Sequence, residues 1–227
     1  MNSDSLFGTP GVWERIIGAR DLVWPDDDVI RCTQRFFGGK SPEERAALTA
    51  FDIGFGTGQH TLYLALEGFQ VTGIDVADVA MQRTREKLVS ARLKADIRQE
   101  ELSTTSFEDN SFDYVVAWGV LFLKPDTEIG ADLRKIYDLM RPGGILLANF
   151  RTLNNWFYGL GEQQGNDLYL LDERAEEYQG ILYRFFSKDD LAALLTEAGF
   201  ETVYIEYKEW HKFGTKQHSW WLATARK

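Results

Sequence analysis

Residues 52–58 read DIGFGTG and place Gly54, Gly56 and Gly58 within one short turn. Residues 50–53, AFDI, run into this turn as a strand, and a helical stretch begins near Gln59. Glycine permits positive φ and lets a ligand approach the main chain, while the free NH groups of a helix N-terminus favour an electron-rich or anionic group. The stretch therefore predicts a ligand-binding turn between a strand and a helix.

The spacing of the three glycines separates two kinds of cofactor site. A dinucleotide fingerprint has the pattern GxGxxG, which would put the third glycine at position 59. That position is Gln59, and the glycines instead spell GxGxG. A glycine-rich turn alone could bind any nucleotide or form only a tight connection. Further motifs in the sequence are needed to distinguish these functions.

Short apolar runs alternate with longer amphipathic stretches from Thr49 onward, a pattern typical of parallel strands joined by crossover helices. We expect strands at residues 50–53, 70–74, around Ile97, at 112–117 and at 145–150. Helices fill the gaps between them. The chain is therefore expected to fold as an α/β protein.

Two helices carry clear capping signals. Residues 41–49, SPEERAALT, combine a Ser cap with Pro42 at the first helical position and Glu44 at the reciprocal capping position. Residues 187–198, SKDDLAALLTEA, place Asp190 at the same capping position and are followed by Gly199 as a stop. The first helix leads into the first strand, and the second leads into the C-terminal part of the chain.

The chain ends in two stretches rich in β-branched and aromatic residues, at 201–209 and 219–225. Only the nine residues 210–218 separate them, which is too few for a helical crossover of about a dozen residues. We therefore expect an antiparallel pair. Parallel strands closed by a terminal hairpin are unusual among dinucleotide-binding enzymes.

In these features the sequence resembles the class I S-adenosylmethionine-dependent methyltransferases, whose first motif is an acidic residue followed by xGxGxG. Residues 52–58 match that motif, beginning with Asp52. Asp75 follows Gly54 by 21 residues and ends the second strand, where such folds use a carboxylate to accept both ribose hydroxyls. Taken alone, Asp75 could instead be a helix cap.

Two further motifs extend the resemblance. Residues 100–118, EELSTTSFEDNSFDYVVAW, resemble the stretch in which an acidic residue and the next backbone NH read the adenine edge. Counting back from Phe107 selects Glu101 and Leu102, although the adjacent Glu100 could take the place of Glu101. Residues 139–150, LMRPGGILLANF, resemble the structural turn into the fifth strand. Phe55 departs from the small residue of many relatives, and its ring could cover the cofactor or pack in the core.

The resemblance implies a Rossmann-like, doubly wound seven-stranded sheet of order 3-2-1-4-5-7-6 with the last strand antiparallel. It implies S-adenosylmethionine as cofactor and S-adenosylhomocysteine as product. We expect one methyltransferase domain over residues 1–227, with an N-terminal helical lid (1–40), a cofactor-binding core (41–150), an insertion or lid (151–186), and a closing helix and hairpin (187–227). The expected cofactor contacts are Asp52, Gly54, Phe55, Gly56, Gly58, Asp75, Val76, Glu101, Leu102 and Trp118.

The acceptor of the methyl group should bind beside the cofactor, beyond the carboxyl ends of the strands. The N-terminal segment and the segments after the fourth and fifth strands could reach that place, and their aromatic residues could form an apolar lid or belong to the core. The expected acceptor contacts are Trp13, Trp24, Phe122, Arg151, Trp156 and Tyr183. Methyl transfer from a sulfonium needs alignment and exclusion of water rather than a nucleophile, so no catalytic residue is assigned. A base role for His211 or His218 competes with a surface position, and His60 is either a helix-start residue or a ligand contact.

The amino-acid composition argues against nucleic acid, membrane and metal ions as partners. The 227 residues are 44% hydrophobic and 26% charged, as in ordinary globular proteins, with a net charge of −10 and no basic stretch, which argues against nucleic acid. Neither a signal peptide nor an apolar run of about 20 residues is present, so we expect a cytoplasmic protein without a membrane partner. The lone Cys32 and three scattered histidines predict no metal site, and Cys32 is expected in the core.

The class of methyl acceptor is narrowed by motifs of other methyltransferases that this sequence lacks. Residues 117–122, AWGVLF, lack the Asp/Asn-Pro-Pro-aromatic motif of amino-methylating DNA enzymes, and the glutamate pair of arginine methyltransferases is also absent. This leaves a small molecule, N- or O-methylated, as the expected acceptor. An acidic run between residues 156 and 183 would suit a cationic acceptor but is more typical of a solvated face. The alternatives are an NAD-dependent oxidoreductase and a cofactor-binding module without transferase activity.

Overall fold

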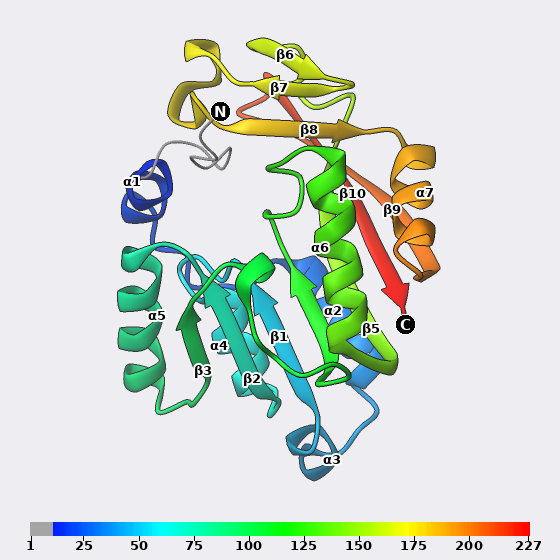
Figure 1. Cartoon of the computed structure of the whole chain (residues 1–227). Coiled ribbons are helices and arrows are strands. Elements are labelled where there is room, and N and C mark those ends of the chain that lie inside the picture. Colours follow the sequence, from blue (N-terminus) through cyan, green and yellow to red (C-terminus); the bar gives the residue numbers. More distant parts are fainter. Residues whose placement is uncertain (1–10) are drawn as a thin grey trace.

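The computed structural model describes residues 11–227, so the first ten residues of the expected N-terminal lid lie outside the described part. Five parallel strands form the centre of the sheet in the order β3-β2-β1-β4-β5, as predicted (Figure 1). Their bounds are β1 Thr49–Ile53, β2 Gln70–Asp75, β3 Asp96–Gln99, β4 Phe112–Ala117 and β5 Met140–Thr152. Strand β5 extends beyond the predicted range at both ends.

The C-terminal pair, β9 Glu201–Lys212 and β10 Lys216–Arg226, completes the sheet. Strand β10 lies between β5 and β9 and is antiparallel to both, which confirms the predicted order. The predicted nine-residue connection was wrong, because the strands run on to a turn of residues 213–215. The rings of Trp210 and His218 stack across the strands at 5.4 Å and continue the ladder, and Phe213 and Gly214 take positive φ at the turn.

Seven α-helices are present among residues 11–227: α1 Val12–Gly18, α2 Asp27–Phe37, α3 Pro42–Ala46, α4 Gln59–Leu66, α5 Asp78–Ala91, α6 Asp126–Leu139 and α7 Lys188–Glu197. The capping box of α3 is confirmed, with Ser41 and Glu44 exchanging hydrogen bonds of 3.2 and 2.6 Å, although the helix ends before residue 49. Two short 3-10 helices, η1 Leu102–Thr104 and η2 Glu173–Tyr178, lie in connections.

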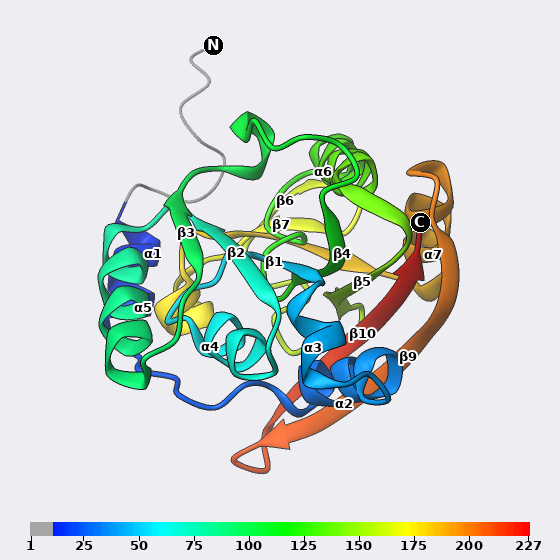
Figure 2. The ribbon, with the colours of Figure 1, turned by 90° about the horizontal axis from the view of Figure 1, so that it is seen from below.

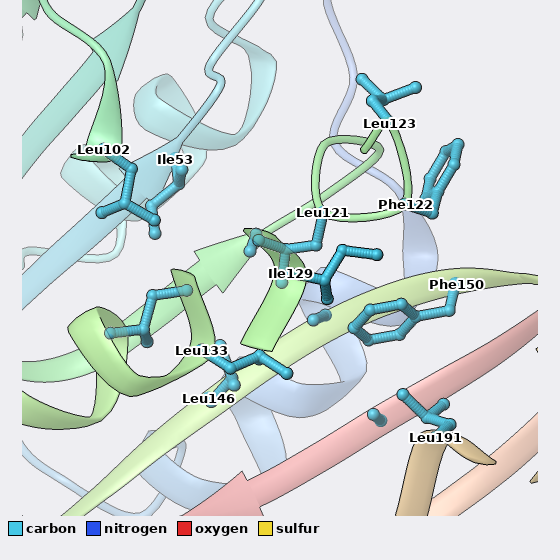
Figure 3. Close-up of a cluster of buried hydrophobic side chains, with 14 of the residues drawn as sticks. Ile53, Leu102, Leu121, Phe122, Leu123, Ile129, Leu133, Leu146, Phe150 and Leu191 are labelled. Carbon is cyan, nitrogen blue, oxygen red and sulfur yellow. The ribbon is translucent and has the colours of Figure 1, made fainter. Parts of the chain in front are cut away.

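Helices cover both faces of the sheet (Figure 2). Side chains alternate along β4, so that Tyr114 and Val116 join the core under α2 and α4, while Val115 and Ala117 face α6. Figure 3 shows part of the α6 side, where Ile129 and Leu133 of α6 lie close to Leu146 and Phe150 of β5. On the other face Cys32 is 4% exposed among apolar residues, which confirms its predicted place in the core. Phe36 and Phe37 pack in the same cluster.

The segment between β5 and α7 forms a small antiparallel sheet that the sequence did not predict. Its strands are β6 Glu162–Gly165, β7 Leu168–Leu170 and β8 Leu182–Phe186. The end of β8 joins the end of β5, with Arg151 opposite Phe185. This segment and α1 lie beyond the carboxyl ends of the parallel strands, where a Rossmann-like sheet binds its ligands (Figure 1).

Among residues 11–227, no helix combines the length and apolar character needed to cross a membrane. The same residues contain no group of three or more His, Cys, Asp and Glu side chains arranged to hold a metal ion.

Candidate functional site

The glycine turn links β1 to α4, and its three glycines all have positive φ, from +55° to +82°. A Cβ atom on Gly58 would lie 2.6 Å from the Thr84 hydroxyl of α5, so this glycine lets two helices approach closely. A Cβ on Gly56 would meet no atom within 4 Å, so the space in front of this residue is open. Gly54 lies against Val120 of the connection after β4. The turn therefore offers bare backbone beside open space.

Asp75 ends β2 next to the glycine turn and is 8% exposed. Its carboxylate accepts hydrogen bonds from the backbone NH of Gly56 at 2.8 Å and of Ala77 at 2.9 Å. Burial raises the pKa of Asp75, and the neighbouring Asp52 raises it further. Each carboxylate oxygen keeps a second lone pair after these bonds, so the group both caps the start of α5 and can accept further donors.

Asp52 is 1% exposed and accepts a hydrogen bond from the Thr61 hydroxyl at 2.6 Å. Its second oxygen, Oδ1, is buried without a hydrogen-bond partner. Burial raises the pKa of this carboxyl group. A buried acceptor without a partner is uncommon in native structures, and it suits a site that receives a donor from a ligand.

Glu100 and Glu101 differ in their surroundings. Glu100 donates its backbone NH to the carbonyl of Asp75 at 3.2 Å, and its Oε2 is buried without a partner. Glu101 precedes η1, and its charge acts on Asp132 of α6. Leu102 is 4% exposed, whereas Val76, directly after Asp75, is 55% exposed. An exposed apolar side chain and an unpartnered carboxylate oxygen therefore flank the end of β2.

Phe55 packs in the core rather than over open space. It is 3% exposed in a cluster with Ala77, Ala80 and Met81, and its ring fills the place where a Cβ on Gly73 would lie. Of the two interpretations of this ring, the structure favours packing. Trp118 is half-buried, with its ring 6.0 Å from that of His60.

Residues 20–26, here called the strap, run across the glycine turn between α1 and α2. The carbonyl of Leu22 accepts hydrogen bonds from the Thr57 hydroxyl at 3.1 Å and from Lys87 at 2.7 Å. Lys87 also donates to the carbonyl of Thr57 at 2.9 Å. Asp26 contacts the His60 ring at 3.2 Å, which makes His60 an anchor of the strap. The strap is thus tied to the loop that it crosses.

The expected acceptor residues divide into two groups. Phe122, Arg151, Trp156 and Tyr183 belong to one buried aromatic cluster, joined by rings 4.2 to 5.3 Å apart and completed by Phe157. Trp13 is half-buried and packs both against the large core that includes Phe122 and Tyr183 and against the cluster of Phe55. Trp24 is on the strap and 84% exposed, so the structure does not bring it to the other five.

Arg151 is the centre of the aromatic cluster. It is 5% exposed, and its guanidinium carbon lies 3.9 Å from the ring centre of Trp220, 4.9 Å from Phe157 and 5.0 Å from Tyr183. Within residues 11–227 its guanidinium makes one hydrogen bond, from Nη2 to the Tyr183 hydroxyl at 3.5 Å, while Nε and Nη1 are buried without partners. Burial lowers the pKa of Arg151 and raises that of Tyr183 to about 12.

Two more nitrogens near this cluster have no hydrogen-bond partner. They are Nε1 of Trp156 and Nε2 of His218, whose rings lie 6.2 Å apart. Burial, with the positive charge of Arg151 and two lysines, lowers the pKa of His218 to about 4, so its imidazole is neutral at pH 7. His211, the other histidine of the hairpin, is exposed.

The cluster and the glycine turn are close neighbours. Val120 contacts Gly54, and Phe122, two residues further on, belongs to the cluster. Asn149 accepts a hydrogen bond from the Gly119 NH at 2.6 Å and lies two residues before Arg151, on the same side of β5. The connection after β4 thus joins the two halves of the site.

Sequence reasoning missed Phe157, Tyr178, Trp220 and Arg20 as parts of this region. Arg20 of the strap donates to the Tyr178 hydroxyl at 2.6 Å and pairs with Glu177, which joins the N-terminal segment to η2. The available signal was that Trp220 lies in the predicted last strand; its position opposite Arg151 is visible only in the structure. The acidic residues of this segment are paired or exposed, for example Asp172 with Arg174 and Glu176 with Lys216, as expected of a solvated face.

Known proteins match this architecture. A family model described as "Methyltransferase domain" matches residues 50–144, the part that holds the glycine turn, Asp75 and the two glutamates. A solved S-adenosylmethionine-dependent methyltransferase from Methanosarcina mazei is 25% identical, covers 79% of this chain and 92% of its own, and has a TM-score of 0.67. Over residues 50–144 the chain is therefore similar to the class I S-adenosylmethionine-dependent methyltransferases. Solved methyltransferases of this fold are described as S-adenosylmethionine-dependent or contain its product S-adenosylhomocysteine.

Two further relatives show how far the similarity extends. The demethylmenaquinone methyltransferase of Desulfitobacterium hafniense is 32% identical over 112 residues, which are 47% of this chain and 43% of that protein. The chain spans less than half the length of the first curated relatives that it matches. The N-methyltransferase NodS from Bradyrhizobium japonicum, solved with S-adenosylhomocysteine, covers 99% of both chains at 17% identity and a TM-score of 0.68, and therefore shares the fold.

Proposed function

We propose that this protein binds S-adenosylmethionine at the glycine turn and transfers its methyl group to a small molecule. The observation that supports this most strongly is the open backbone at Gly56 beside the carboxylate of Asp75, at the carboxyl ends of β1 and β2. An N- or O-methylation is the reaction that we infer. No side chain is required as a nucleophile.

The residues around the turn fit this cofactor. S-adenosylmethionine presents hydrogen-bond donors on its ribose, its ammonium group and its adenine, and the turn is lined with carboxylates. Asp75 keeps free lone pairs, while Asp52 Oδ1 and Glu100 Oε2 are buried acceptors without partners. These three carboxylates and the NH groups of the turn would hold the cofactor, and the exposed Val76 would offer an apolar surface to the adenine. Glu101 and Leu102 remain the alternative adenine contacts.

The protein would act by alignment and by exclusion of water. When bound, S-adenosylmethionine supplies an electrophilic methyl group on a sulfonium. The strap crosses the glycine turn, and Arg20 joins it to η2, so these contacts would close the site over both reactants. The aromatic cluster beside the turn would desolvate the acceptor. The neutral imidazole of His218, beside this cluster, would be able to accept a proton from it.

A small-molecule acceptor is supported by the proteins that share the motifs or the fold. One is named a demethylmenaquinone methyltransferase, and another is the N-methyltransferase NodS. The net charge of −10 and the absence of nucleic-acid and protein methyltransferase motifs in the sequence point the same way. We expect no contact with nucleic acid or membrane.

A cofactor-binding experiment tests the proposal. A ligand at 100 times its dissociation constant stabilises a fold by about 2.7 kcal/mol, so S-adenosylhomocysteine should raise the melting temperature by several degrees while NAD does not. A shift with NAD alone, or equal shifts with both, would support the oxidoreductase instead. Labelled S-adenosylmethionine with a panel of amines, hydroxyls and carboxylates then distinguishes an enzyme from a binding module, which would bind the cofactor and methylate none of them.

A further inference from the structure

Among residues 11–227 the buried guanidinium of Arg151 has no counter-ion. Arg151 is 5% exposed, and its one hydrogen bond is a long one to the Tyr183 hydroxyl. The main groups that act on its pKa are Tyr183, Tyr178 and Arg20, none of which is a carboxylate. By contrast, the other buried arginine, Arg184 at 3% exposure, pairs with Asp126 at 2.6 Å. A buried charge is usually paired, so Arg151 departs from the rule that Arg184 follows.

The aromatic rings around Arg151 do not replace that counter-ion. A guanidinium over a ring face gains cation–π attraction, but its N–H donors still require acceptors. Two of its nitrogens, Nε and Nη1, have none, and Nε1 of Trp156 is likewise buried without an acceptor. Because such orphaned donors are costly in a folded protein, their concentration in one cluster indicates that a ligand supplies the acceptors.

The charges around the cluster favour an anion. Arg20 and Lys216 approach it from the strap and from β10, and Lys216 lies 4.3 Å over the Trp156 ring. Arg20 pairs with Glu177 and Lys216 with Glu176, so Arg151 is the cation of this cluster that has no carboxylate partner among residues 11–227. The walls, formed by Phe122, Phe157, Tyr183 and Trp220, are flat apolar rings that suit a planar partner.

We propose that Arg151 binds an anionic oxygen of a planar methyl acceptor, a carboxylate or a phosphate attached to an aromatic ring. This rests on the proposed methyl transfer, because it assigns the acceptor to the cluster that touches the glycine turn through Phe122 and Val120. Arginine presents its N–H groups as a planar fork that matches such oxygens. Arg151 is thereby a specificity-determining residue.

Calorimetry measures the binding of three compounds to the protein: benzoate, phenyl phosphate and the neutral benzamide. Each titration is run in the presence and in the absence of S-adenosylhomocysteine. At least one anion should bind the wild type at least tenfold more tightly than benzamide does. In Arg151→Gln that anion should bind at least tenfold more weakly, while the affinity for S-adenosylhomocysteine changes less than twofold. Arg174→Gln is the matched control, because Arg174 is exposed and paired with Asp172, and it should bind like the wild type.

Three results would overturn the proposal: no binding of either anion, equal binding of benzamide, or unchanged anion binding in Arg151→Gln. If that variant does not fold, Arg151→Lys replaces it; this variant keeps the charge without the fork and should weaken anion binding several-fold, and unchanged binding would again refute the proposal. Because the anions are titrated without cofactor as well, a failure of the cofactor site is seen separately, in the S-adenosylhomocysteine titration.

Discussion

Gly56 and Gly58 are two residues apart in one turn, yet their surroundings predict different phenotypes. In Gly56→Val the side chain enters the open space in front of the turn, and we expect cofactor affinity to fall at least a hundredfold, about 2.7 kcal/mol, while the fold survives. In Gly58→Val the new Cβ would lie 2.6 Å from Thr84, which is fully buried, so the helices must separate and folding should fail.

Circular dichroism and calorimetry with S-adenosylhomocysteine distinguish these outcomes. If Gly56→Val bound S-adenosylhomocysteine with unchanged affinity, the cofactor would not lie against the glycine turn. Loss of folding in both variants would assign both glycines to close packing or strained backbone, since valine rarely adopts a φ near +55°.

Asp75 has two functions in the proposed site, and a matched variant separates them. In Asp75→Ala the ribose loses its charged acceptor, which should weaken cofactor binding by roughly 1.5 to 3 kcal/mol. The variant also loses a cap of α5, because Asp75 accepts from the Ala77 NH. Glu14 accepts from the Asp78 and Val79 NH groups at the same helix start, so Glu14→Ala removes only a cap.

We expect Asp75→Ala and Glu14→Ala to lower the free energy of unfolding by similar amounts, about 1 kcal/mol, in urea titrations. Calorimetry should show weakened S-adenosylhomocysteine binding in Asp75→Ala alone. Equal affinities in the two variants would mean that Asp75 is a cap and that the ribose lies elsewhere.

His218 predicts a pH dependence of stability. Its pKa is about 4 in the folded protein and near 6.5 when unfolded, so the unfolded chain takes up the proton first as the pH falls. The stability that neutral His218 contributes is therefore complete above pH 6.5 and is lost between pH 6.5 and pH 4. Between pH 7 and pH 5 the wild type should lose about 1 kcal/mol more than His218→Gln, a value reduced for partial exposure. Urea titrations at both values check this, and parallel losses would contradict it.

At the scale of elements, Lys87 of α5 is the main tie of the strap. It donates to two backbone carbonyls and pairs with Asp21 at 2.6 Å. We expect Lys87→Met to expose residues 20–26 to proteases and to weaken S-adenosylhomocysteine binding roughly three- to tenfold, because the strap would no longer be fixed over the glycine turn. Limited proteolysis with mass spectrometry and calorimetry measure both effects, and the exposed Lys94→Met serves as control. An unchanged cleavage rate would show that the strap is held by its other contacts.

The same elements show how far sequence reasoning extends. Strands β1 to β5 were predictable, because buried parallel strands occur in a sequence as short apolar runs between amphipathic stretches. The order of the terminal hairpin followed from the resemblance to the family. Strand β6 was not predictable, since EQQG at 162–165 is exposed at every position and carries no apolar alternation, whereas β8, LYRFF at 182–186, is a buried run that the sequence analysis did not assign. The glycine turn was predictable from the spacing of Gly54, Gly56 and Gly58 in the sequence. The surroundings of Arg151 depend on β5, β8 and β10 meeting in space, which no local pattern encodes.

At the scale of the whole molecule, the two halves of the proposed site come from different parts of the chain. The glycine turn, Asp75 and the glutamates lie within residues 50–144, the range matched by the methyltransferase family. Arg151, Trp156, Tyr183 and His218 lie after it, and the strap lies before it. The N-terminal segment and the insertion meet through Arg20 and Tyr178. Cofactor binding can therefore stay constant among relatives while the acceptor changes.

The position of β9 has a consequence for solubility. Within residues 11–227, β9 pairs with β10 alone and forms the edge of the sheet (Figure 2). The backbone N–H and C=O groups on its outer side could pair with a strand of another molecule, which is how edge strands cause aggregation. Acidic and basic side chains, Glu206, Lys208, Glu209 and Lys212, follow one another along this strand. Glu206 and Lys208 are also engaged by Arg31, Asp27 and Asp28 of α2. A second copy that added its own rim strand would have to desolvate these charged side chains and disturb the ion pairs with α2, which opposes fibril formation through β9.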